Sequence, residues 1–290
     1  MARMLKNCRK INTLPFTIPS TCTNIDEIFA GTAITDVSGL TFDTRITSAT
    51  NWYSSSITKA NNVIIKNNYV KLNIPTLTEC DGLLLYNMNN LANFLENTAI
   101  PRLTGLTIPN TVRSMKCFLK NNTAITVAEI KMPNDVTDIS ELISGCSLLR
   151  DISKTTFASG ITNATDWNLG VPLTTLNNVT LNTGLVKFTG INTVKYVENF
   201  VIGDNVTNID NLFKNCYNLT SDIYIPLHVV SCISAFENCR GLTHAQSNWD
   251  QTYNNGITPT NCYAGCTGIT HIDGMDLGVN EYIKGLDDIP

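Results

Sequence analysis

The chain has 290 residues, of which 15% are charged, and its net charge is −4 at pH 7. This composition excludes a broad basic surface for nucleic acid, and no apolar run approaches the ~20 residues of a membrane-spanning helix. Residues 1–10 are basic but lack the apolar core of a signal peptide. We therefore expect a protein without a membrane span that stays in the cytoplasm where it is made until it is released.

Residues 1–15 precede the first recognisable repeat and are predicted to form an N-terminal arm. The repeat opens at Ile18-Pro19 and continues through Phe29 to a Gly-Thr corner. Proline lacks a backbone N–H and biases the preceding residue toward extended backbone, so a short strand is expected to end here. Apolar residues then follow at spacings of three and four, which favours a short helical or 3₁₀ turn. Each coil is therefore predicted as a strand, a Pro-bearing turn, a helical or 3₁₀ turn and a polar corner.

The same pattern returns along the chain. A second copy covers residues 46–57, and two clear copies open around Pro109 and Pro133, 24 residues apart. Residues 161–167 repeat residues 46–52 almost position by position. A repeated period of this size indicates stacked coils, each of which contacts only its neighbours.

Two intervals, residues 60–88 and 173–200, depart from the pattern and are mostly strand-like. The first is predicted to be either one irregular coil or a hairpin insertion. Insertions between coils often lie on the binding side of a solenoid. A local function is therefore expected in residues 60–90, 168–200 or 246–258.

The best-preserved copies begin at Phe213 and Phe236, 23 residues apart. Each consists of an aromatic residue, a charged residue, Asn-Cys, two variable residues and Leu-Thr. A large aromatic and a small cysteine at fixed positions suit a core ladder, because free Cys packs as a small apolar residue. The predicted structural positions of this ladder are Phe29, Phe118, Cys146, Phe213, Cys216, Phe236, Cys239, Tyr263 and Cys266.

The ten cysteines are predicted to be mostly reduced and structural, since they are too sparse for a disulfide-stapled small domain. An alternative is a metal site at Cys262 and Cys266, with His271 close by. Zinc sites of this kind need a second ligand pair at matching spacing, and the sequence has none. No metal and no cofactor is predicted.

The coil pattern resembles the leucine-rich repeat of the BspA type. The residues that carry the resemblance best are Ile225-Pro226, Val229, Phe236, Asn238-Cys239 and Leu242-Thr243. The resemblance implies an α/β repeat solenoid of leucine-rich-repeat-like coils, each ~23–25 residues long, over residues 16–275, with strand-rich irregular inserts and residues 276–290 as a C-terminal tail or cap. It also implies binding to other macromolecules, since proteins of this family bind partners or lie on surfaces, and similar Asn-rich arrays occur on bacteriophage tails.

Catalytic patterns are missing from the sequence. The three histidines, His228, His244 and His271, stand in no local motif of a metalloprotease or serine hydrolase. His244 and His271 each follow the Leu/Ile-Thr that closes a coil, so they are interpreted as equivalent positions of two coils. We predict that the chain is not an enzyme; a glycan-acting enzyme is the alternative, and it would require a pair of carboxylates in a cleft.

The loop 246–258 lengthens the last interval between coils and contains the candidate surface-binding residues. Trp249 and Tyr253 among Gln246 and Asn254 would suit stacking on a sugar. The alternative is that both aromatic residues cap the end of the core. Trp52 and Trp167, in contrast, occupy the apolar frame of a coil and are predicted to be core residues.

These observations predict a non-enzymatic bacteriophage virion protein, associated with a tail, baseplate or fibre, that acts as a protein-protein or host-surface binding module. Its expected partners are other virion proteins and a glycan or protein of the host surface, and its expected location is the virion. A homo-oligomer is an alternative to a monomer, because exposed edges of a solenoid can stack on another chain. The alternative function is a secreted bacterial cell-surface adhesin of the BspA type.

Overall fold

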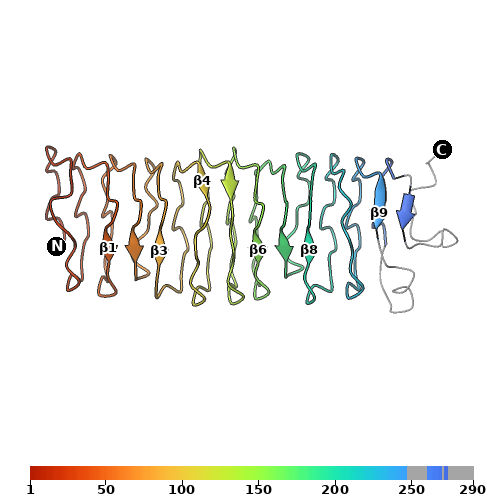
Figure 1. Ribbon diagram of the computed structural model, residues 1–290, viewed down its shortest axis with the longest axis horizontal. Helices are drawn as coiled ribbons and strands as arrows, with labels where there is room; N and C mark the ends of the chain where they lie inside the picture. The colour runs from red at the N-terminus through yellow and green to blue at the C-terminus, as the bar shows by residue number, and fades with distance from the viewer. Residues whose placement is uncertain (247–259, 270, 274–290) are drawn as a thin grey trace. The chain divides into compact units, whose positions relative to one another are not determined.

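A computed structural model describes residues 1–246, 260–269 and 271–273 (Figure 1). The chain divides into two compact units. Unit 1 comprises Met1–Leu148 and Asn163–Gly170, and unit 2 comprises Leu149–Thr162 and Val171–Pro290. Each unit is a repeat solenoid in which successive coils are joined by parallel β-pairing, as predicted.

The strands are short, and each pairs with its equivalent in a neighbouring coil. Unit 1 contains a three-stranded sheet in the order β1-β2-β3 and the pair β4-β5. Their bounds are Thr41–Phe42 (β1), Ile64–Ile65 (β2), Leu84–Leu85 (β3), Arg102–Leu103 (β4) and Val127–Ala128 (β5). Unit 2 contains the sheet β6-β7-β8 and the pair β10-β9, whose bounds are Thr156–Phe157 (β6), Thr180–Leu181 (β7), Val201–Ile202 (β8), His244–Gln246 (β9) and His271–Asp273 (β10).

The helical and 3₁₀ turns predicted for each coil are wrong: the described residues contain no helix of either kind. Their places are taken by corners with two left-handed residues four positions apart. Asn211 and Asn215 have φ of 59° and 62°, and Asn93 and Asn97 have φ of 58° and 59°. Such a corner also places apolar residues three or four positions apart, and Asn adopts the left-handed region at little cost. Apolar spacing therefore could not separate these corners from a helical turn.

Backbone amides link each corner to the next coil in a regular ladder. The amide of Glu27 donates to the carbonyl of Thr50 at 2.9 Å. The first residues join this ladder, since the amides of Arg3 and Asn7 donate to the carbonyls of Asp26 and Ala30, both at 2.8 Å. The segment predicted as an arm is thus hydrogen-bonded to the coil that follows it, while the domain boundaries at residues 15 and 275 stay predictions.

Aromatic side chains stack through the core of unit 2. Phe213 lies between Phe188 and Phe236, at centroid distances of 5.2 and 5.9 Å, and Tyr263 continues the stack at 5.2 Å from Phe236. Burial of one such ring stabilises the fold by about 1.5–3 kcal/mol. The nine structural positions predicted from the sequence are all at most 3% exposed, as are Trp52 and Trp167.

Buried thiols form a second column beside the aromatic stack. The thiols of Cys216, Cys239 and Cys266 donate to backbone carbonyls of the preceding coil at 3.0, 3.1 and 2.9 Å. Burial raises the pKa of the Cys216 and Cys266 thiols to about 12. A thiol with so high a pKa stays protonated at neutral pH and remains a hydrogen-bond donor. All ten cysteines are free.

The two strand-like intervals are short regular coils, so a hairpin insertion at residues 60–88 is wrong. β2 pairs in parallel with both β1 and β3, and β7 pairs in parallel with both β6 and β8. The interval from the start of β2 to the start of β3 is shorter than the interval from β1 to β2. The interval from β7 to β8 is likewise shorter than the interval from β6 to β7, and the difference is three positions in both units. Each unit therefore contains one coil that is shortened relative to the coil before it.

Candidate functional site

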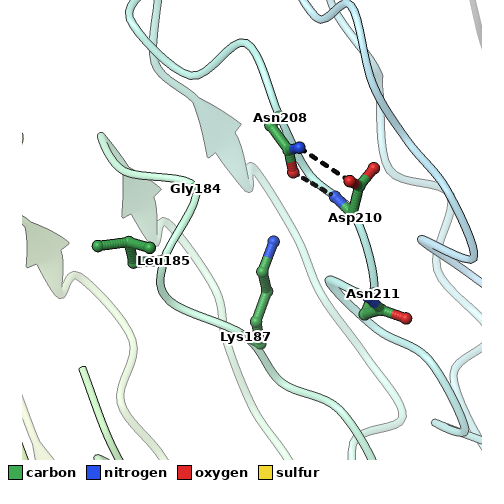
Figure 2. Close-up of a pocket in the computed structure, with 6 residues that line it drawn as sticks. All are labelled: Gly184, Leu185, Lys187, Asn208, Asp210 and Asn211. Atoms are coloured by element: carbon green, nitrogen blue, oxygen red, sulfur yellow. Dashed lines mark hydrogen bonds between the residues drawn. The ribbon is translucent and has the colours of Figure 1, made fainter. Parts of the chain in front are cut away.

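The shortened coil of each unit lacks the first of the two left-handed corner residues. In unit 2, residues 186–188 run directly into the second corner position, where Gly190 has a φ of 74°. We call the place of the missing corner residue, beside the lysine of each shortened coil, the recess. In unit 2 it is a groove of about 410 Å³ lined by Gly184, Leu185, Lys187, Asn208, Asp210 and Asn211 (Figure 2).

The two shortened coils have equivalent sequences. Residues 69–72 are Tyr-Val-Lys-Leu and residues 185–188 are Leu-Val-Lys-Phe. In both, the second and fourth residues are fully buried, and the first is exposed, by 54% at Tyr69 and 51% at Leu185. The lysine between the two core residues is Lys71 in unit 1 and Lys187 in unit 2. The missing corner therefore recurs once in each unit beside the same sequence pattern, although in unit 1 neither corner position has a positive φ.

Both lysines are largely enclosed by neighbouring residues. The Nζ of Lys71 donates to the carbonyl of Asn90 at 3.1 Å and lies 5.9 Å from the ring centroid of Phe94. Burial lowers the pKa of Lys71 to about 8. Burial also lowers the pKa of Lys187 to about 8, against the opposing effect of Asp210. Figure 2 shows the Lys187 side chain pointing from the shortened coil toward Asn208 and Asp210.

The carboxylate of Asp210 is held by the protein itself. It accepts hydrogen bonds from the Ser231 hydroxyl at 2.6 Å, the Ile233 amide at 2.7 Å and the Asn208 side-chain amide at 2.8 Å. This carboxylate therefore joins neighbouring coils, and the lysine that lines the same groove is Lys187.

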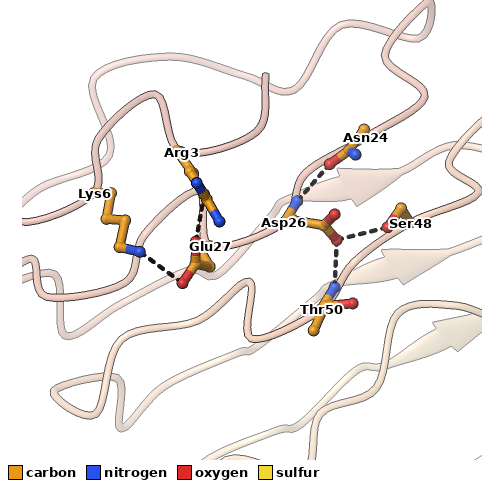
Figure 3. A network of polar contacts seen from close by, with 7 residues as sticks. All are labelled: Arg3, Lys6, Asn24, Asp26, Glu27, Ser48 and Thr50. Atoms are coloured by element: carbon orange, nitrogen blue, oxygen red, sulfur yellow. Dashed lines mark hydrogen bonds and ion pairs between the residues drawn. The ribbon is translucent and has the colours of Figure 1, made fainter.

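Asp26 of unit 1 shows the same arrangement (Figure 3). Its carboxylate accepts hydrogen bonds from the Ser48 hydroxyl at 2.7 Å and the Thr50 amide at 2.6 Å, and these bonds hold the pKa of Asp26 below its usual value. Beside it, Glu27 pairs with Arg3 and Lys6 at 2.6 and 2.7 Å. The two basic residues nearest the N-terminus are thus engaged within unit 1.

A second surface, which we call the outward face, lies on β2 and β3 of unit 1. Ile64 and Leu84 are register partners in this sheet, and Tyr86 follows β3. Leu84 is 43% exposed and Tyr86 48%. Ile64 and Tyr86 line a groove of about 400 Å³ with Lys66 and Asn87. Apolar and aromatic side chains beside one lysine give this face the composition of a protein-binding surface.

No protein-family model matches the chain, and no curated protein matches its sequence. Among solved structures, the chain is similar to a leucine-rich repeat protein from Bacteroides ovatus (14% identity, TM-score 0.36), covering 88% of this chain and 59% of that one. It is similar to a leucine-rich cell surface protein from Faecalibacterium prausnitzii, with 15% identity and a TM-score of 0.30, covering 92% of this chain and 89% of that one. It is also similar to a leucine-rich repeat protein from Eubacterium ventriosum, with 16% identity and a TM-score of 0.34, covering 97% of this chain and 76% of that one. The chain thus spans less than two thirds of the Bacteroides ovatus protein, and similarities of this size transfer no function to it.

The loop predicted to bind a surface falls mostly outside the described residues. This holds for Trp249, Tyr253 and Asn254, whereas Gln246 is the last residue of β9 and pairs with Asp273 of β10. The prediction of a binding loop at residues 246–258 is therefore not tested.

Two of the three histidines, His228 and His244, have described side-chain contacts. His244 and His271 are register partners in β9 and β10, which confirms them as equivalent positions of two coils. His244 Nδ1 lies 3.2 Å from Asp222 Oδ2, and His228 Nε2 lies 3.0 Å from the carbonyl of Gly203. The described residues hold no group of three or more His, Cys, Asp or Glu side chains arranged for a metal, and no helix long and apolar enough to cross a membrane.

Sequence reasoning missed Lys71 and Lys187. The signal was present, because both lie in intervals where the coil pattern weakens, and both stand between two apolar residues after an exposed apolar one. Residues 46–52 match residues 161–167 in sequence, and the shortened coils that follow them, at residues 69–72 and 185–188, match each other as well. Extending that comparison as far as the shortened coils would have found the pair of lysines.

Proposed function

We propose that the chain is a non-catalytic repeat module that binds another protein through the outward face of unit 1. The observation that carries the proposal is the exposure of Leu84 and Tyr86, by 43% and 48%; Leu84 is in register with Ile64 on a paired strand, and Tyr86 follows β3. Exposed apolar groups held on a rigid ladder lose little conformational entropy on binding, and such patches mark interaction sites.

Two settings suit such a module. One is the bacteriophage virion predicted from the sequence, and the other is the surface of a bacterial cell, as for adhesins of the BspA type. One of the three solved neighbours is described as a cell surface protein, and none of the three as a virion component. Mass spectrometry of purified virions and of peptides released from intact cells by protease separates the settings, because the protein should be recovered from only one of them.

The binding face is tested by site-specific photo-crosslinking in the cell or particle that contains the protein. A benzophenone amino acid placed at Tyr86 should crosslink to a distinct protein partner, and Leu84→Glu should reduce this product at least about tenfold. The matched control carries the same amino acid at Tyr196, which is 57% exposed in unit 2. Equal products from both positions, or none from Tyr86, would contradict the proposal.

A further inference from the structure

A complete coil satisfies the carbonyl groups of the coil that follows it. In unit 2, the amides of Ile209 and Asn211 donate to the carbonyls of Ser231 and Ile233, both at 2.9 Å. In unit 1, the amide of Glu27 donates to the carbonyl of Thr50 at the same distance. In these pairs of coils, a complete coil thus supplies corner amides to the complete coil that follows it.

The shortened coils lack the residues that would supply these amides. Facing the recess of unit 1, the carbonyls in question belong to Asn90 and Ala92. The Nζ of Lys71 takes the place of the first missing amide, at 3.1 Å from the Asn90 carbonyl. The Ala92 carbonyl accepts no hydrogen bond from any residue within the described ranges. One acceptor is therefore left open two residues after the carbonyl that Lys71 binds.

The recess of unit 2 differs in how the first carbonyl is covered. Gly184 packs against Asn208 so closely that a Cβ on it would lie 2.4 Å from the Asn208 carbonyl oxygen. The second carbonyl, of Asp210, accepts no hydrogen bond from the part of the chain that the structure describes. Lys187 lines the same groove. Both recesses thus combine a lysine ammonium with one open backbone carbonyl.

We propose that each recess binds an extended acidic segment of a protein partner, with a carboxylate on Lys71 or Lys187 and a backbone amide on the carbonyl of Ala92 or Asp210. An ammonium has three N–H donors, and at Lys71 one of them is used by Asn90, so donors remain for a carboxylate. A partner amide would restore the bond that the shortened coil cannot make, as in strand addition to an exposed edge. The site uses other residues than the outward face and does not depend on it.

The neighbouring side chains favour a polypeptide over an acidic glycan. The open carbonyl stands at a ladder position where, in complete coils, a backbone amide lies at 2.9 Å. The exposed residue two positions before the lysine is Tyr69 in unit 1 and Leu185 in unit 2. Leucine offers no aromatic ring for stacking on a sugar, whereas both residues offer apolar contact to a peptide side chain.

The two recesses should differ in affinity. Asp210 places a carboxylate in the recess of unit 2, and Ala92 stands at the equivalent position of unit 1. Although the Asp210 carboxylate is bound by three donors, it still repels an incoming acidic group. The recess with Lys71 is therefore expected to bind the acidic segment more tightly.

The proposal is tested by isothermal titration calorimetry of the full chain with an end-capped Glu-Ala hexapeptide. We expect two sites per chain, with the tighter one removed by Lys71→Gln and the weaker one by Lys187→Gln, each weakened at least about tenfold. The matched control is Lys195→Gln, because Lys195 is exposed and lies over the ring of Tyr196 at 4.8 Å. The control should leave both sites unchanged.

Two further probes separate the alternatives. A peptide with N-methylated amides should bind at least about tenfold more weakly, since it cannot reach the open carbonyl. Lys71→Arg should fold and bind, which distinguishes loss of the site from loss of structure in Lys71→Gln. No peptide binding to the unaltered chain, equal weakening by Lys195→Gln, equal binding of the N-methylated peptide, or tighter binding of a tetragalacturonate oligosaccharide would each overturn the proposal.

Discussion

Replacement of Phe213 by alanine should test how far neighbouring coils in unit 2 stabilise one another. Phe213 is fully buried, stacks on Phe188 at 5.2 Å and on Phe236 at 5.9 Å, and meets the ring edge of Phe200 at 5.5 Å. Loss of a buried Phe costs about 3–5 kcal/mol. Because three aromatic contacts disappear as well, we expect a value in the upper part of that range.

Phe213→Leu is the matched variant. It keeps most of the buried apolar volume but loses the stacking, so it should cost about 1–1.5 kcal/mol. Urea unfolding gives both free energies of unfolding. Hydrogen exchange should show faster exchange at Phe188 and Phe236, where coils touch the cavity, and unchanged exchange at Phe94 in unit 1. A loss below about 1 kcal/mol for Phe213→Ala, or equal acceleration at all three positions, would refute the argument.

Three further predictions follow from the ladder. Asn238 has a φ of 63° and donates to the Asn215 side chain at 2.8 Å, so Asn238→Ala should destabilise the fold by about 1 kcal/mol more than Asn238→Gly, measured by urea unfolding. Cys8 is the one exposed cysteine of the ten, so Ellman's reagent should label one thiol rapidly in the native protein and the rest only on unfolding. Because the folded pKa of Asp26 lies below its ordinary value of 3.8, its stabilising contribution is present above pH 3.8 and is lost as pH falls through the folded value. Asp26→Asn should therefore reduce the loss of stability between pH 4 and pH 2, measured by thermal unfolding.

The core ladder could be predicted from the sequence because its chemistry repeats. An aromatic and a cysteine recur at a fixed distance, as at Phe213-Cys216 and Phe236-Cys239, and each such pair is buried. Stacked coils place identical positions next to each other, so a repeated residue type is direct evidence of a column. The hydrogen bond from each thiol to the preceding coil could not be predicted, since it depends on where the carbonyl of that coil points.

The corners were misread for a physical reason. Helical turns and double left-handed corners both return apolar side chains to one side after three or four residues. The residue that distinguishes them is Asn or Gly at two positions four apart, because these residues tolerate positive φ. Asn93 with Asn97 and Asn211 with Asn215 carried that signal. Glu141 and Cys117 show why it is incomplete, since both adopt positive φ without belonging to the residue types that favour it.

The recess was harder to predict because it arises where a shortened coil lacks residues that a complete coil contains. A shortened coil shifts the apolar frame by three positions, so residues 60–88 and 173–200 looked like strands without a repeat. Only the parallel register of β2 with β3, and of β7 with β8, shows that these segments are coils of the same kind. Their carbonyl partners lie in the next coil, and no local pattern in the sequence indicates them.

The presence of a lysine in both shortened coils is explained in part by backbone carbonyls that need a hydrogen-bond donor. Omitting a corner leaves carbonyls of the next coil without amide partners, and an unsatisfied carbonyl that is also shielded from water costs about 1–3 kcal/mol. A long side chain with a terminal donor can reach across the missing turn, and Lys71 does so at Asn90. Satisfying one carbonyl does not require a charge, however, because Gln could donate as well. At Lys187 the equivalent Asn208 carbonyl packs against Gly184, which donates no hydrogen bond to it in the described part of the chain, and the lysine is present there too. The charge common to both recesses is the property that backbone satisfaction leaves unexplained and that an acidic partner would use.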